Sequence, residues 1–411
     1  MPAQPAYHFI NGRQGLEDLC GRLQGQPVLA MDTEFIRERS YTPKLELVQV
    51  AAADGTVAII DYGTLGRVDG DPFAALAANP AVLKVFHAAE QDLEMLRQLA
   101  GSVIGPIWDT QLVTGLFPYD GRLGYAAVVE TLLGVKMVKS ETLTDWSRRP
   151  LAREQLNYAA EDVRSLLALY EVERERLTAL GRLEWAREEC ERVRQSVETG
   201  LQQLEDDRLH YRRVRGWRDL DGRTLAILRE LAAWREKTAC EHDRPRGSIM
   251  RDELLCEIAR RAPVLPGQLA ALRGTRARDL ERFGAEIVQA VKRGQAVPAA
   301  ARPAAAPDEG RPEGAAQALL SLLQSVVQTT AAEKGVAAPL IATTADLSRL
   351  VAAQVNGQAL RAEDCALLTG WRRELVGREI ADVLAGRRAV CWDPARKALV
   401  LSPHQPELME N

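Results

Sequence analysis

The sequence predicts an α/β domain followed by domains built from helices alone. Short β-branched or alternating apolar runs, which are typical of strands, gather in the first third of the chain. From about Pro72 onward, apolar residues recur at the i, i+3, i+4 spacing of helices. Near position 300, a stretch rich in Ala and Pro without apolar periodicity predicts a linker. An early sheet followed by helices indicates an α/β first domain.

The elements of the first domain follow in order along the chain. Strands are predicted over residues 28–35, 45–51, 56–60 and 83–87, with a brief one at 107–108. Helices are predicted over residues 88–99, 111–117, 125–133 and 153–180. Together they form the sheet and the covering helices of one α/β unit.

The rest of the chain is predicted to be helical, with one hairpin at its end. Residues 208–294 show the strongest helical periodicity at 224–235 and 251–261. Further helices are predicted at 316–333, 346–355 and 363–384, and the hairpin pairs 389–392 with 398–401. A chain of 411 residues is expected to hold two to four domains at roughly 100–200 residues each. The predicted division is an α/β domain (1–205), a helical module (208–295), a linker (296–313) and a C-terminal unit (314–411).

Composition excludes several classes of protein. Hydrophobic residues at 46% and charged residues at 27% are ordinary globular values, which argues against wholesale disorder. No run of 18 apolar residues occurs, and the first residues lack the pattern of a secretory signal, so no membrane association is expected. The six cysteines stand singly, without a Cys-x-x-Cys pair, which favours the reducing cytoplasm. No glycine-rich phosphate loop follows a strand, so no dinucleotide cofactor is expected.

Positive charge is concentrated in one segment. The whole chain has a net charge of −4, yet residues 208–293 hold 20 Lys and Arg against 12 Asp and Glu. We call residues 208–295 the basic module. A basic segment within an acidic chain is typical of a protein that binds a polyanion in one place, although a solvated helical surface gives the same count.

Two acidic residues end the first long predicted strand. Because side chains alternate along a strand, Asp32 and Glu34 point to the same face. Like charges so close are unfavourable unless a cation or protons neutralise them. Such pairs also occur at strand ends with only a turn-forming role.

Two further segments carry candidate acids. Asp92 lies in the first turn of a predicted helix, where the helix dipole alone would favour an acid. Tyr158 and Asp162 are spaced i, i+4 on another helix, so they share a face. Asp162 precedes an apolar run and is predicted to point toward the packed side, where a carboxylate needs a partner.

Together these residues match one chemistry. Four carboxylates supply the charge that two divalent ions neutralise, and hard oxygen ligands suit Mg²⁺ or Mn²⁺. Paired ions of this kind promote in-line attack of water on phosphorus. Tyr158 is placed to orient the attacking water.

The combination resembles a known family. Asp-x-Glu, then His-Ala-x-x-x-Asp-Leu-Glu, then Tyr-x-x-x-Asp resemble the three motifs of the DEDD exonuclease superfamily, tyrosine subclass. Longer strings resemble the ribonuclease D family: Met31-Asp32-Thr33-Glu34-Phe35, Trp108-Asp109-Thr110-Gln111, Lys139-Ser140-Glu141 to Trp146, and Arg149-Pro150-Leu151. The basic module resembles the HRDC (helicase and RNase D C-terminal) domain through Leu231–Glu236, Asp243–Arg246 and Asp252–Leu255. The segment from Thr369 to Gly377 resembles a second, divergent HRDC domain.

The resemblance implies a ribonuclease H-like sheet with a 3′→5′ exoribonuclease site, followed by HRDC domains. It implies Asp32, Glu34, Asp92 and Asp162 as ligands of two divalent ions, and Tyr158 as the water-positioning residue. The implied substrate is structured RNA with a 3′ overhang, chiefly transfer RNA precursors, from which nucleoside 5′-monophosphates are released. We expect the chain to act as a monomer.

Candidate substrate contacts lie around these motifs. Phe35 follows the acidic pair and is a candidate wedge against the terminal base, although alternation points it toward the core. Trp146, Arg148 and Arg149 are candidates to line the entry path, with plain packing as the alternative for Trp146. Arg212 and Arg213 follow Tyr211, and such interleaving of aromatic and basic residues is typical of RNA-binding surfaces. We expect Asp109 to cap the following helix and His87 to make a hydrogen bond at the end of its strand.

Two other functions compete with the exoribonuclease. One is the same reaction on DNA. The motifs do not distinguish DNA from RNA, because they indicate no contact with the 2′-hydroxyl group. The other is a non-catalytic protein that binds nucleic acid through its helical modules. The complete carboxylate set argues against it, since charges that repel without metal need not persist in an inactive site.

Overall fold

The computed structural model describes residues 7–118, 123–137, 145–305 and 314–403. The first domain is built on a six-stranded mixed sheet in the order β1-β4-β3-β2-β5-β6. The long central strands β2 and β3 are antiparallel, while β5 and β6 run parallel to β2. The strands are β1 (His8–Ile10), β2 (Val28–Ile36), β3 (Lys44–Ala52), β4 (Val57–Asp61), β5 (Leu83–Phe86) and β6 (Ile107–Asp109).

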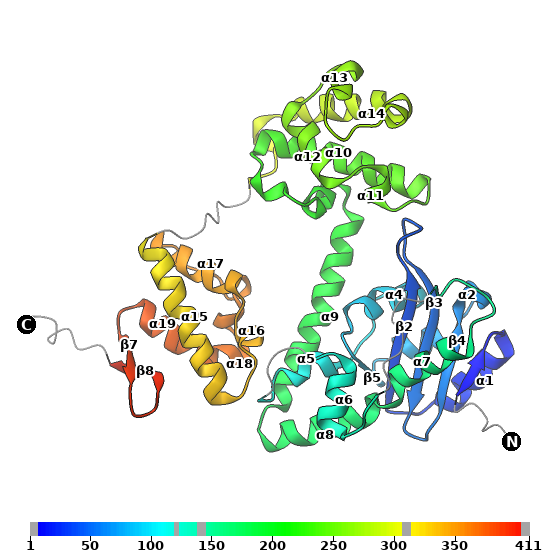
Figure 1. Cartoon of the computed structure of the whole chain (residues 1–411), viewed down its shortest axis with the longest axis vertical. Helices are drawn as coiled ribbons and strands as arrows, with labels where there is room; N and C mark the ends of the chain where they lie inside the picture. The colour runs from blue at the N-terminus through cyan, green and yellow to red at the C-terminus, as the bar shows by residue number, and fades with distance from the viewer. Residues whose placement is uncertain (1–6, 119–122, 138–144, 306–313, 404–411) are drawn as a thin grey trace, which may run out of the picture.

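Helices cover this sheet and lead out of the domain (Figure 1). The central strand β2 is contacted by α4, α7 and α8, so residues at its end lie between helices from distant parts of the sequence. The helices are α1 (Arg13–Leu23), α2 (Tyr62–Leu65), α3 (Pro72–Ala78), α4 (Glu90–Ala100), α5 (Thr110–Thr114), α6 (Tyr125–Leu133), α7 (Arg153–Arg164), α8 (Leu166–Ala179) and α9 (Leu183–Glu205). The long helix α9 connects the domain to the basic module (Figure 1).

The basic module consists of helices around a core of its own. That core includes Leu228, Leu231, Leu255 and Ile287, all buried. Its elements are the 3₁₀ helices η1 (Asp207–Arg213) and η2 (Trp217–Asp219), and α10 (Gly222–Glu241), α11 (Arg246–Ile249), α12 (Asp252–Arg261), α13 (Pro266–Ala270) and α14 (Ala277–Gln295). The 3₁₀ turn η3 (Ala299–Ala301) follows.

The C-terminal unit shares one apolar core with the first domain. Leu323 and Trp371 belong to the same buried cluster as Leu29 and Val85. Its elements are α15 (Ala315–Lys334), α16 (Ala338–Ile341), α17 (Thr344–Val355), η4 (Ala362–Asp364), η5 (Ala366–Leu368), α18 (Gly370–Arg372), the π-helix η6 (Arg373–Gly377), α19 (Arg378–Leu384), β7 (Arg388–Asp393) and β8 (Ala398–Pro403).

The predicted α/β fold followed by helical domains is confirmed, and the predicted strands agree with β2 to β8 within two residues. Strand β1 and helices α1, α2 and α9 were not predicted. Residues 153–180 form two helices rather than one, because the helix ends at Ser165. Residues 363–384 are not one helix: Gly370 has a left-handed φ of 53° and lies against Glu188, where a Cβ would collide with the carboxylate. None of the described helices has the length and apolar character needed to cross a bilayer.

Candidate active site

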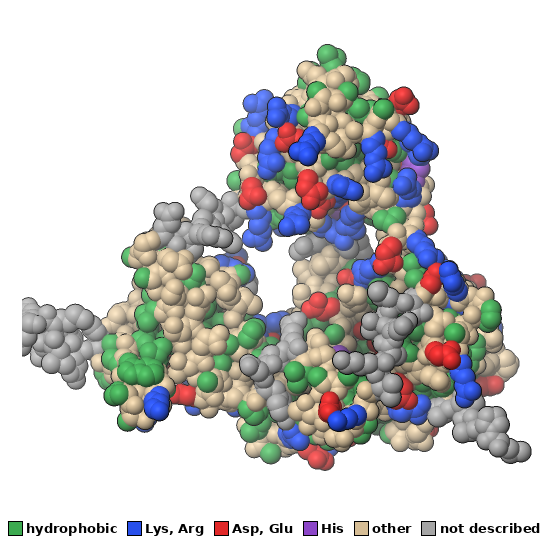
Figure 2. Space-filling model, viewed as in Figure 1, with side chains coloured by type: hydrophobic (Ala, Val, Ile, Leu, Met, Phe, Trp, Pro, Cys, Tyr) green, Lys and Arg blue, Asp and Glu red, His purple; other side chains and the backbone are tan. Residues whose placement is uncertain are grey.

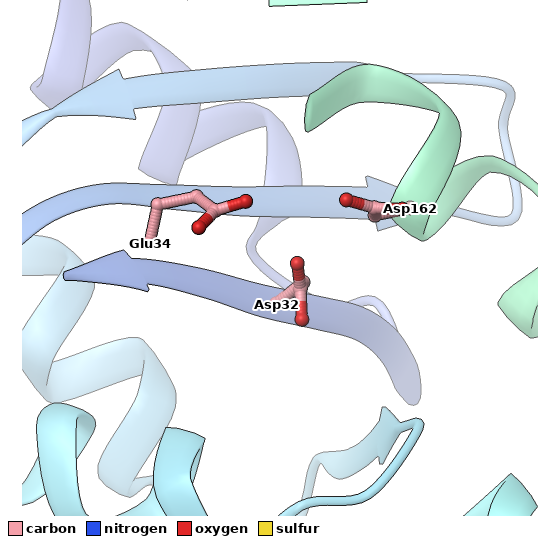
Figure 3. A group of neighbouring side chains, drawn as sticks. All are labelled: Asp32, Glu34 and Asp162. Atoms are coloured by element: carbon pink, nitrogen blue, oxygen red, sulfur yellow. The ribbon is translucent and has the colours of Figure 1, made fainter. Parts of the chain in front are cut away.

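Three carboxylates converge at the end of β2. Asp32 and Glu34 extend from the same face of this strand, and Asp162 reaches them from α7 (Figure 3). One oxygen atom of each side chain lies within 4.8 Å of the other two. The predicted alternation along the strand is therefore realised, and the helix that carries Asp162 completes the group.

Asp92 and Tyr158 join this group from two sides. Asp92 is 6% exposed in the first turn of α4, where its Oδ1 accepts a 2.5 Å hydrogen bond from Thr33 Oγ1. It lines the same cavity as the other three acids but stands outside their close group of oxygens. The Tyr158 hydroxyl group forms a hydrogen bond with Asp162, its i+4 neighbour on α7. All five predicted residues thus line one cavity of about 510 Å³.

Burial and mutual repulsion disfavour the ionised forms of these acids. Burial raises the pKa of Asp32 to about 7. Burial, followed by repulsion from the other acids, raises the pKa of Glu34 to about 9, and burial with repulsion from Asp32 raises that of Asp162 to about 8. The pKa of Asp92 is raised well above its ordinary value for the same reasons. None of the described residues that line the cavity is Lys or Arg, and burial lowers the pKa of His87 there, so the oxygen cluster fits divalent cations.

These shifts predict how stability depends on pH without metal. Because the folded protein binds protons more tightly than the unfolded chain, the free energy of unfolding should fall as pH rises from about 4 to about 9. Urea unfolding of the metal-free protein across this range measures the effect. Glu34→Gln should flatten the dependence, and Mg²⁺ or Mn²⁺ at pH 8 should raise the stability of the wild type more than that of the variant. Identical pH profiles for the two proteins would contradict the prediction.

Asp109 organises the backbone beside the acids. As predicted, it caps α5, accepting from the amides of Gln111 and Leu112. Its carboxylate also accepts from the amides of Ala88 and Ala89, at 3.0 Å each. Ala88 has a φ of 65°, so the predicted helix at 88–99 begins only at Glu90. Asp109 therefore fixes the loop that leads to Asp92, a role that local sequence did not reveal.

Other cavity residues surround these acids. His87 Nδ1 lies 2.9 Å from Thr110 Oγ1, which confirms the predicted hydrogen bond. Gln111, Tyr125 and Val193 also line the cavity and were not predicted. Val193 was not predicted because it lies on α9, a helix that was not predicted either.

The predicted substrate contacts of the first domain separate into two groups. Phe35 lines the cavity and is at the same time packed against the apolar core of the domain. Trp146 is only 6% exposed and packs near Tyr158, with the ring centroids 6.1 Å apart, so packing is its role rather than stacking on a base. Arg148 is exposed and pairs with Asp145. Part of the motif before Trp146, residues 138–144, lies outside the described residues.

Arg149 corrects another expectation. Its guanidinium group bonds both oxygens of Asp61 and also contacts Glu46 at 3.1 Å. Both acids are buried, with Asp61 and Glu46 each 1% exposed. These bonds hold the segment before α7 against β3 and β4, so Arg149 is committed to the fold rather than to phosphates.

Arg212 and Arg213 lie next to the acidic cavity. Both are exposed on η1 and line a second cavity of about 360 Å³ with residues of α4 and α9. Glu90 lines both cavities, so the two adjoin. Lys and Arg side chains also gather over the basic module, including its edge toward the opening beside the C-terminal unit (Figure 2).

Comparisons with known proteins agree with this architecture. Residues 7–176 match the family model of a 3′-5′ exonuclease, and residues 224–291 match that of the HRDC domain. The chain is 37% identical over 405 residues to a ribonuclease D of Acidiphilium cryptum, covering 98% of this chain and 99% of the relative. It is 34% identical over 381 residues to a ribonuclease D of Pseudomonas paraeruginosa, covering 92% and 98%. The crystal structure of Escherichia coli RNase D, described as an exoribonuclease involved in structured RNA processing, matches with a TM-score of 0.81 and 28% identity over 92% of this chain and 98% of that one.

Proposed function

Because this chain belongs to the ribonuclease D family and is a 3′→5′ exoribonuclease, we propose that the cavity at the end of β2 is its catalytic centre. The observation that carries the proposal is the convergence of Asp32, Glu34 and Asp162 within 4.8 Å, with Asp92 and Tyr158 on the same cavity. The exonuclease family depends on divalent metal ions, which fits this donor set.

We propose that Asp32, Glu34, Asp92 and Asp162 hold two divalent ions, Mg²⁺ or Mn²⁺. When bound, such ions lower the pKa of the attacking water and stabilise charge on the phosphate oxygens. The protein side chains bind and orient the other reactants. Tyr158 holds its hydroxyl group beside Asp162 and orients the water, and Phe35 contacts the terminal base. Attack of water on phosphorus breaks the bond to the 3′ oxygen and releases a nucleoside 5′-monophosphate.

The role of Tyr158 leads to a measurable expectation. Tyr158→Phe keeps all four carboxylates and removes only the hydroxyl group that orients the water. We expect kcat to fall by about 10²-fold, the typical contribution of one positioned proton-transfer or orienting group, with KM little changed. Steady-state hydrolysis of a labelled RNA measures both constants. A variant with the kcat of the wild type would remove Tyr158 from the reaction.

Structured RNA, and precursor tRNA with a 3′ extension in particular, is the proposed substrate. The E. coli relative acts in structured RNA processing, and the basic module places Arg212 and Arg213 next to the catalytic cavity. We further propose that the chain works as a cytoplasmic monomer with functional units at 1–205, 208–295 and 314–411, joined through the linker 296–313.

The test compares 5′-labelled precursor tRNA with a DNA strand of the same 3′ sequence. We expect stepwise, metal-dependent shortening of the RNA from its 3′ end, stopped by EDTA, and slower trimming of the DNA. Trimming of DNA at an equal or higher rate would favour an exodeoxyribonuclease. Tight binding of RNA without cleavage would leave only a nucleic-acid-binding role.

A further inference from the structure

The connection between β2 and β3 reaches out of the first domain to the basic module (Figure 1). We call residues 37–43 the hairpin tip. At the tip, the Tyr41 hydroxyl group donates a 2.9 Å hydrogen bond to Glu236 Oε2 on α10, and the Tyr41 amide donates to Asp243 Oδ1 at 3.1 Å. The Tyr41 ring also packs against the core of the basic module. One residue of the first domain is thus bound by side chain and backbone to the neighbouring unit.

The acceptor on the basic module is a buried carboxylate. Glu236 is 2% exposed, and Arg246 Nε lies 3.4 Å from its second oxygen. Burial, together with the charge of Glu236, raises the pKa of Tyr41 to about 12, so the phenol stays protonated and donates. A hydrogen bond from a neutral phenol to a buried carboxylate is among the stronger kinds, because the acceptor has little access to water.

The base of the hairpin is fixed to the catalytic helix. Arg37 Nη2 bonds Glu94 Oε2 on α4 at 2.7 Å, and Gln98 Nε2 of the same helix donates to Pro43 O at 3.1 Å. The Arg37 guanidinium group also lies over the Phe35 ring, 4.9 Å from its centroid. The hairpin is therefore bonded at both of its ends to α4, the helix that carries Asp92.

The docked hairpin tip adjoins the cavity that holds Arg212 and Arg213. Arg213 interacts electrostatically with Tyr41 and Glu236 and also with Glu94, which lines that second cavity. Since Glu90 joins the second cavity to the catalytic one, the position of the basic module determines how close these arginines lie to the carboxylates.

We propose that Tyr41 is a positioning residue for substrate preference: it docks the hairpin tip on the basic module and so holds Arg212 and Arg213 in the cavity that adjoins the catalytic one. An RNA long enough to reach both cavities then binds more tightly than a short one. This inference rests on the proposed function, because it assumes that RNA enters the carboxylate cavity. It extends that function by assigning the hairpin tip a role in selecting long substrates.

The test compares two substrates in the full-length protein. For Tyr41→Phe, we expect KM for precursor tRNA to rise roughly tenfold, the effect of losing one hydrogen bond to a charged group, while kcat stays unchanged. Both constants for a trinucleotide should equal those of the wild type. Tyr170→Phe is the matched control, because the Tyr170 hydroxyl group makes no hydrogen bond with the described part of the chain and its ring packs against Trp108 on β6. An unchanged KM for precursor tRNA, or an equal loss on both substrates, would overturn the proposal.

Hydrogen exchange provides a readout that needs no catalysis. In Tyr41→Ala, amides of the hairpin tip and of residues 242–246 should exchange faster than in the wild type, while amides of the sheet around β2 keep their exchange rates. Unchanged exchange would show that Tyr41 does not hold the units together and would overturn the docking. Faster exchange in an enzyme that fails to cleave any RNA would instead contradict the proposed function.

Discussion

Asp32→Asn is expected to reduce the rate of RNA hydrolysis by about 10³-fold or more. Asp32 is one of three acids whose oxygens lie within 4.8 Å of one another, so its replacement by an amide removes a carboxylate from the proposed metal site (Figure 3). Stabilisation of phosphoryl charge by bound metal contributes several kcal/mol to such reactions, and each 1.36 kcal/mol corresponds to about tenfold in rate. Single-turnover cleavage of 5′-labelled RNA at saturating Mg²⁺ or Mn²⁺ measures the effect.

Glu161→Gln is the matched control for this variant. Like Asp32→Asn, this substitution replaces one carboxylate by an amide. Glu161 lies on α7, the helix that carries Asp162, but it is exposed and pairs with Arg164. We expect its cleavage rate to stay within a factor of about two of the wild-type rate. Substitutions at exposed positions usually change the free energy of unfolding by no more than about 0.5 kcal/mol. If both variants lost activity equally, or if Asp32→Asn kept a tenth of it, the assignment of the site would be wrong.

Arg372→Ala is expected to destabilise the docking of the C-terminal unit by about 3–5 kcal/mol, the usual cost of breaking a buried ion pair from one side. Arg372 is 5% exposed and Glu189 is 3% exposed, and the guanidinium group bonds both carboxylate oxygens. The Arg372 Nε atom also donates to Leu340 O at 2.8 Å. Without Arg372, Glu189 on α9 stays buried with a hydrogen bond from the indole of Trp371 and a longer ion pair, 3.9 Å, with Arg192.

Urea unfolding and limited proteolysis of the C-terminal unit measure this change. Arg378→Ala serves as the control, because the Arg378–Glu374 pair is exposed and such pairs contribute at most about 1 kcal/mol. Arg372→Met combined with Glu189→Met should recover much of the lost stability, since no charge then remains buried. Equal stability of Arg372→Ala and Arg378→Ala would show that the buried pair does not hold the unit. A point variant is preferable to truncation, because removing residues 314–411 would also expose the shared core.

The C-terminal unit packs against the first domain through several further contacts. Trp371 stacks on Trp185 of α9 with ring centroids 4.9 Å apart, and Ala337 N donates to Gly115 O after α5. Arg182 also donates to Leu116 O, at 2.7 Å, and to Gly335 O, at 3.0 Å. The C-terminal unit therefore packs against the helices that support the cavity wall at Val193.

The candidate site was predictable from sequence to the extent that its residues follow local rules. Alternation placed Asp32 and Glu34 on one face, and helical spacing placed Tyr158 beside Asp162. Both relations depend only on the conformation of a few consecutive residues. The convergence of the three motifs was predicted through resemblance to a family, since spacing within each motif does not determine the distance between motifs.

The remaining features depend on partners distant in the sequence. The ring of Phe35 lies between the cavity and the apolar core, and the carboxylates of Asp61 and Glu46 bind the guanidinium group of Arg149. Both outcomes required the sheet to be assembled. The sequence around Phe35 and Arg149 contains no pattern that predicts these contacts.

The sequence by itself determined every described strand except β1, most of the helices, the acidic residues and the basic module, because periodicity and local charge dictate them. Only the tertiary structure decided which unit docks where. Helix α9 shows the reason: its buried face includes Glu189, which has no apolar signal and whose two carboxylate oxygens are bound there by Arg372, 183 residues later. Such a pair forms because the two opposite charges meet in the folded chain. In the sequence, neither residue can be told apart from the many arginines and glutamates that lie on the surface.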